Sequence, residues 1–89
     1  MMAAVNNTPA WYSKEEAKCF EKVKELARKI LSAKSVIVDP EEIHIVIECR
    51  TALSTDDILL ICDFNEECPE VPVSYAYESD RVKGKRYDL

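Results

Sequence analysis

The first clear pattern of hydrophobic and polar positions along the chain is helical. Apolar side chains recur at intervals of three and four residues, at Phe20, Val23, Leu26, Ala27, Ile30 and Leu31. This spacing places them on one face of an α-helix. The preceding segment, Ser13 to Glu16, fits a capping box, in which the serine hydroxyl and the glutamate satisfy the first free backbone amides. The pattern predicts a helix over residues 14–33.

Beyond residue 34 the pattern changes to the two-residue alternation of β-strands. Strands are predicted at 35–38, 43–53, 58–65 and 71–78, and residues 85–89 could add a fifth at the edge of the sheet. The predicted fold class is α+β, with one long N-terminal helix packed on an antiparallel β-meander of four or five strands. Residues 1–12 are expected to form a flexible arm and residues 13–89 a single domain.

A four-residue turn at 54–57 would join the two longest predicted strands as a hairpin. In that register Cys49 lies opposite Cys62 and Ile47 opposite Phe64, with the apolar sides of both strands pointing the same way. This agreement between turn length and hydrophobic pattern is what a register assignment requires.

The other face of the predicted sheet carries four apolar residues, Ile37, Val46, Leu59 and Ile61. A sheet face in contact with water would be polar. Either the arm, the tail or a second subunit covers this face, or it is an apolar patch that meets another protein. The same register sets Glu48 opposite Asp63, and like charges in that position destabilise a strand pair by about 0.2–1 kcal/mol. Arg50, two residues along, could relieve part of this repulsion.

Charge is divided unevenly along the 89 residues. Residues 14–34 carry a net charge of +3 and residues 81–89 also +3, whereas residues 35–80 carry −11, with Arg50 as their only base. A dense acidic surface repels nucleic acid and attracts proteins whose own sites are basic. The alternative is that the acids merely keep the fold soluble.

The sequence holds little that points to catalysis or to a cofactor. The four cysteines, Cys19, Cys49, Cys62 and Cys68, include no closely spaced pair of the kind that zinc sites use, so free thiols are expected. By strand alternation the only histidine, His44, points away from Cys49, so the two cannot form a catalytic pair. We therefore expect no enzyme activity, no metal and no cofactor. No apolar run reaches membrane-spanning length and no signal peptide is recognisable, so a cytoplasmic protein without a membrane partner is expected.

From residue 43 onward the chain resembles the uracil-DNA glycosylase inhibitors of phages. The shared features are Ser54-Thr55-Asp56, an apolar strand at 58–60, an acidic loop with proline, and a Gly84-Lys85 turn with Leu89 at the end. That family comprises small acidic proteins that resemble DNA, with a five-stranded antiparallel sheet and flanking helices. The resemblance implies an inhibitor in which Glu41 or Glu42 stands nearest to the family's partner-gripping glutamate. Where the family has a second helix between its first two strands, this chain has only residues 39–42.

Together these observations predict a small non-enzymatic inhibitor or adaptor, of the kind that phages and other mobile elements encode. It would bind a protein through an acidic sheet surface and so occupy that partner's nucleic-acid site, with the apolar residues adding contact area. The expected partner-binding acids are Asp39, Glu41, Glu42, Glu48, Asp56, Asp57, Asp63, Glu66, Glu67 and Glu70. One alternative is a homodimeric structural subunit joined through the outer sheet face. Another is weak nucleic-acid binding through the basic tail, at Arg81, Lys83, Lys85 and Arg86.

Overall fold

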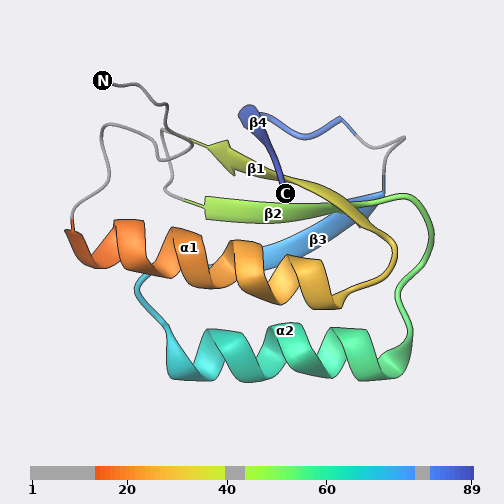
Figure 1. The fold of residues 1–89 in the computed structure, drawn as a ribbon, viewed down its shortest axis with the longest axis horizontal. Coiled ribbons are helices and arrows are strands. Elements are labelled where there is room, and N and C mark those ends of the chain that lie inside the picture. The colour runs from red at the N-terminus through yellow and green to blue at the C-terminus, as the bar shows by residue number, and fades with distance from the viewer. Residues whose placement is uncertain (1–13, 40–43, 78–80) are drawn as a thin grey trace.

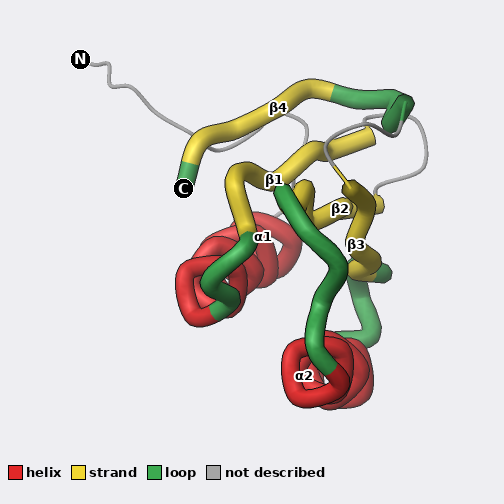
Figure 2. Tube along the Cα trace, turned by 90° about the vertical axis from the view of Figure 1, so that its right-hand side faces the viewer, coloured by secondary structure: helices red, strands yellow, loops and turns green. Residues whose placement is uncertain are grey.

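Two helices cover one face of a four-stranded sheet. This computed structural model describes residues 14–39, 44–77 and 81–89. The elements in chain order are α1 (Lys14–Lys29), β1 (Ala33–Asp39), β2 (His44–Cys49), α2 (Thr55–Glu67), β3 (Val73–Tyr77) and β4 (Lys85–Asp88). Figures 1 and 2 show both helices on the same side of the sheet. The predicted α+β class is confirmed.

The sheet is mixed, so the predicted antiparallel meander is wrong. The strand order is β3-β2-β1-β4. β1 pairs antiparallel with both β2 and β4, whereas β2 and β3 are parallel. Parallel neighbours need a crossover connection, and α2 supplies it. The predicted edge strand at 85–89 is present as β4, and it lies beside β1 (Figure 1).

The segment predicted as the strand 58–65 is helical and forms the body of α2. The residues read as a turn at 54–57 are its N-cap, Ser54, and the start of its first turn, where the backbone amide of Asp57 donates to the Ser54 hydroxyl at 3.2 Å. Because this segment is a helix, the predicted pairings of Cys49 with Cys62, Ile47 with Phe64 and Glu48 with Asp63 are also wrong. Arg50 accordingly has no such repulsion to relieve.

The side chain of Asn65 attaches α2 to the sheet. Its amide nitrogen donates to the Val73 carbonyl at 2.8 Å, and its amide oxygen accepts from the Val73 backbone amide at 2.9 Å. The side chain thus satisfies both backbone groups of the residue that begins β3, as a neighbouring strand would. This double contact fixes the position where the chain leaves α2 and enters the sheet.

α1 begins where it was predicted to begin but ends four residues early, at Lys29. The Ile30 amide donates to the Ala27 carbonyl and the Ala33 amide to the Ile30 carbonyl, both at 3.0 Å, so the chain turns there and enters β1. Leu31 is consequently 98% exposed instead of lying on the buried helix face. The predicted cap at Ser13 lies outside the described residues.

The core lies between α1 and the helix-facing side of the sheet. From the sheet it includes Val36, Val38, Ile45, Ile47 and Cys49, all buried. The alternation predicted for residues 43–53 therefore assigned Ile45, Ile47 and Cys49 to the correct face. The opposite face carries Ile37 and Val46, as predicted, and the structure shows that the two are register partners.

Candidate functional site

The outward face of α2 combines exposed acids with exposed leucine. Asp56, Asp63, Glu66 and Glu67 are exposed, and Leu59 among them is 53% exposed. The helical spacing of three, four and seven residues places Asp56, Asp63 and Glu66 around Leu59. We call the set Asp56, Leu59, Asp63, Glu66 and Glu67 the acidic face.

The acidic face is not arranged for helix stability. Asp56 in the first turn complements the helix dipole, but Glu66 and Glu67 lie in the last turn, where acids are unfavourable and no base accompanies them. Of the thirteen residues of α2, all of them described, only Ile61 is buried. The helix is therefore attached by few apolar contacts and carries charges that oppose its dipole at the C-terminal end.

A groove of about 530 Å³ runs between α1 and α2. The charged residues that line it are Lys22, Glu25 and Lys29 from α1 and Asp63 and Glu67 from α2, with Leu26 among the apolar residues between them. The α1 wall thus has a net positive charge, although it includes Glu25, and the α2 wall has a negative one. The acidic face extends from the outer surface of α2 to the edge of this groove.

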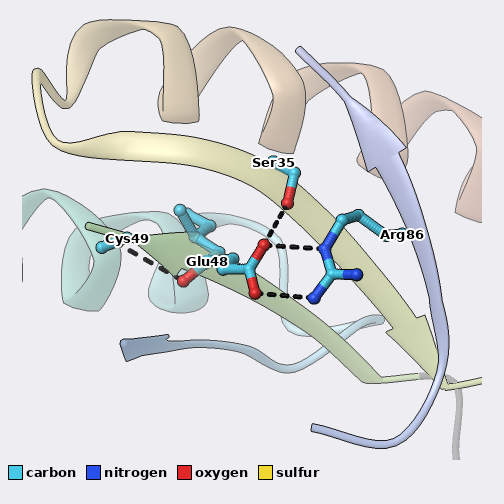
Figure 3. Close-up of polar contacts among 5 residues, drawn as sticks. Ser35, Glu48, Cys49 and Arg86 are labelled. Atoms are coloured by element: carbon cyan, nitrogen blue, oxygen red, sulfur yellow. Dashed lines mark hydrogen bonds and ion pairs between the residues drawn. The ribbon is translucent and has the colours of Figure 1, made fainter. Parts of the chain in front are cut away.

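A second polar cluster lies on the sheet face away from the helices (Figure 3). Arg86 reaches from β4 across β1 to Glu48 on β2, and its Nε and Nη2 atoms donate to the two carboxylate oxygens, each at 2.7 Å. The Ser35 hydroxyl donates to Glu48 Oε1 at 2.8 Å. Glu48 is 1% exposed, whereas the Arg86 side chain is 53% exposed. Together with the Ser35 hydroxyl, this bidentate pair joins the three neighbouring strands β4, β1 and β2.

The Arg86 hydrogen bonds lower the pKa of Glu48, and they outweigh the opposing effect of burial; the Ser35 hydroxyl adds to the lowering. The carboxylate is consequently ionised in the folded protein and already neutralised by Arg86. Glu48 is therefore committed to holding the sheet together and is not available to meet a partner's cations.

The other predicted site residues fall into three groups. Asp56, Asp63, Glu66, Glu67 and Glu70 are exposed, Asp57 is partly buried beside its cap, and Asp39 is 8% exposed at the end of β1. Glu41 and Glu42 lie outside the described residues. Of the four predicted apolar contact residues only Leu59 is exposed, because Ile37, Val46 and Ile61 are buried. The four do not form one exposed surface.

The structure also brings together residues that the sequence did not connect. The Cys19 thiol on α1 donates to Glu70 Oε2 at 3.7 Å, and Cys68 lies beside both. Burial, followed by the nearby Cys68 and Glu70, raises the pKa of Cys19 to about 11. No spacing along the chain indicates this cluster, because Cys19 and Glu70 are 51 residues apart.

Comparisons of the chain with protein-family models, with curated proteins and with solved structures gave no match. No helix in the described parts of the chain is both long enough and apolar enough to cross a membrane. The segment 58–60, which the resemblance to the glycosylase inhibitors assigns to a strand, lies within α2. Membership of that family stays a prediction.

Proposed function

We propose that this protein is a non-enzymatic inhibitor or adaptor that binds another protein through the acidic face of α2. The partner surface is rich in Lys and Arg and is one that otherwise holds nucleic acid. The observation that carries the proposal is the set of exposed acids around Leu59 on a helix without a single base. The sequence-based prediction assigned the binding surface to the sheet, whereas the present proposal assigns it to α2.

The physical basis is charge complementarity combined with a small apolar contact. Exposed carboxylates attract a cationic surface over about one Debye length, roughly 8–10 Å at moderate salt, and thereby raise the association rate. Once the surfaces meet, Leu59 supplies apolar area in the centre while the acids form the rim. Nucleic acid is excluded because the same cations cannot pair with both acidic ligands.

The arrangement of charge at the end of α2 supports a binding role over mere solubility. Acids that only solubilise the fold could lie anywhere on the surface, including positions that favour the helix dipole. Glu66 and Glu67 instead occupy the last turn, where each acid costs about 0.3–1 kcal/mol of helix stability relative to a base. Residues retained against stability are often residues that function requires.

Reversing two charges on the acidic face tests this proposal. We expect D63K/E66K to weaken binding of the partner at least tenfold, because attraction becomes repulsion at two central positions. The partner would be captured from the native host at low salt, identified, purified and titrated by calorimetry at several salt concentrations. Affinity should fall steeply with salt, and duplex DNA should compete for the same site on the partner.

The matched control is E15K/E21K on α1. It changes the net charge by the same amount, and Glu15 and Glu21 are also exposed, but they lie on the other helix. We expect a much smaller loss of affinity than for D63K/E66K. Equal losses of affinity in the two variants would show that only net charge matters and not the acidic face. An affinity that does not depend on salt would contradict the electrostatic mechanism.

The two alternatives predict different results in the same preparation. A homodimer would sediment as a dimer at low micromolar concentration without any partner. A nucleic-acid binder would bind duplex DNA directly, through the basic side chains of the C-terminal tail. Of those side chains, Arg86 already pairs with Glu48, and the Lys85 ammonium lies 5.6 Å from the ring centre of Tyr87.

A further inference from the structure

Three potential metal ligands converge where the C-terminal end of α2 meets α1. They are Cys19 in α1, Cys68 at the C-terminal cap of α2, and Glu70 in the turn that follows. Their two sulfur atoms and a carboxylate oxygen all lie within 4.8 Å of one another. The helices run in opposite directions, so the end of α2 lies beside the first half of α1 (Figure 1).

This separation is close to what a zinc ion requires. With Zn–S bonds of about 2.3 Å and Zn–O bonds of about 2.1 Å, tetrahedral ligand atoms lie about 3.6–3.8 Å apart. The distance from Cys19 Sγ to Glu70 Oε2 is 3.7 Å. Side-chain adjustments of less than about 1 Å would therefore place all three atoms around one ion.

The ligand types also select among metals. Two thiolates are soft ligands that favour zinc over magnesium or calcium, and one carboxylate is compatible with zinc. Cys19 and Cys68 are 6% and 8% exposed, while Glu70 is exposed at the rim. The groove between the helices reaches Cys68, which gives an ion a path from solvent.

We propose that Cys19, Cys68 and Glu70 bind one zinc ion, with a water molecule as the fourth ligand. Binding replaces the thiol protons, which are released to solvent, and attaches the end of α2 to α1. The site therefore stabilises the helix that carries the acidic face, which is otherwise held by few apolar contacts. The proposal departs from the sequence-based expectation of no metal, which rested on spacing along the chain. It does not depend on the proposed partner.

Zinc titration of the full chain, stripped with a chelator and kept reduced with a phosphine, tests the site. Calorimetry should give one ion per chain with release of protons. Cobalt in place of zinc should give a thiolate-to-metal charge-transfer band and the intense visible bands of tetrahedral coordination. With zinc about 100-fold above its Kd, the melting temperature should rise, because the ion binds the folded state.

Variants assign the ligands. C19S and C68S should each abolish the charge-transfer band or weaken zinc binding at least a hundredfold. E70Q should weaken binding at least tenfold, and this exposed substitution leaves the core untouched, so it remains informative if a cysteine variant fails to fold. The matched controls are C49S, a buried thiol on β2, and C62S, an exposed thiol on α2. Both should keep the wild-type affinity, with folding checked by circular dichroism.

Several results would overturn the proposal. They are the absence of a bound ion in the reduced protein, an E70Q affinity equal to wild type, or zinc binding that survives in C19S/C68S. The last result would assign the ion to surface carboxylates. A disulfide between Cys19 and Cys68 in protein isolated without reductant, combined with no zinc affinity after reduction, would identify the pair as a redox site instead.

Discussion

Arg86→Met should destabilise the protein by about 3 kcal/mol, the lower end of the range for breaking a buried ion pair. The substitution keeps the length and apolar stem of the side chain but removes the guanidinium group that pairs with Glu48, which is 1% exposed. The carboxylate would then be buried with the Ser35 hydroxyl as its remaining hydrogen-bond donor among these contacts. The lower end applies because the Arg86 side chain is half exposed and water can partly replace it. Urea unfolding measures the loss.

E48Q/R86M is the matched control for this prediction. Glutamine keeps the shape of Glu48 and can still accept the Ser35 hydrogen bond, but it has no charge to bury. The double variant should therefore recover most of the stability that R86M loses. If E48Q/R86M is as unstable as R86M, the loss comes from packing of the arginine stem and not from the unpaired carboxylate.

The contribution of Glu48 to the pH dependence of stability should have opposite signs in the wild type and in R86M. In the wild type the folded-state pKa of Glu48 lies below its ordinary value of 4.5, so its contribution is present above that value and is lost as pH falls through the folded pKa. In R86M burial remains without the arginine, so the folded pKa should lie above the ordinary value. Lowering the pH then reduces the destabilisation of the variant, because protonation removes the buried, unpaired charge of Glu48. The stability gap between the two proteins should narrow from about pH 7 to about pH 4.

The sequence predicted the parts of the fold that depend on a single periodicity. Ile45 and Ile47 alternate with outward-facing residues and have β-branched side chains, so their face was predictable. Residues 58–64 are ambiguous, because the apolar residues Ile58, Leu60, Cys62 and Phe64 fit a strand while Ile58 and Ile61 fit a helix. The Ser54 cap and the acids after it favour the helix, and they can equally be read as a turn.

The candidate site was predictable in composition but not in arrangement. The acidic bias of residues 35–80 is visible in the sequence, and five of the predicted acids are exposed. Their grouping around Leu59 depends on α2 being a helix. Similarly, the partner of Glu48 was not predictable, because Arg86 is 38 residues away and reaches it only when β4 pairs with β1. Contacts that depend on strand order cannot be read from local patterns.

Gly84→Ala should be at least as destabilising as Arg86→Met, because Gly84 positions β4. Its φ of 134° lies in the region that residues with a side chain rarely adopt. A Cβ atom there would lie 2.3 Å from the carbonyl oxygen and 2.7 Å from the carbonyl carbon of Val38, in the backbone of β1. Neither atom can move without disturbing the sheet. Backbone strain contributes about 1–3 kcal/mol to this cost, and displacement of β4 would add the loss expected for Arg86→Met, because it separates Arg86 from Glu48.

A double-mutant cycle separates these two effects of Gly84→Ala. If the substitution displaces β4, Arg86 has already lost Glu48 in that background, so G84A/R86M should be little less stable than G84A alone. Amide hydrogen exchange in β1 should become faster in G84A, because the pairing that joins Val36 to Tyr87 is lost. Arg81→Ala, at an exposed position before the strand, should change stability by less than about 0.5 kcal/mol. Fully additive losses in the cycle would show that β4 keeps its place despite the added methyl group, and that the ion pair forms independently of the glycine.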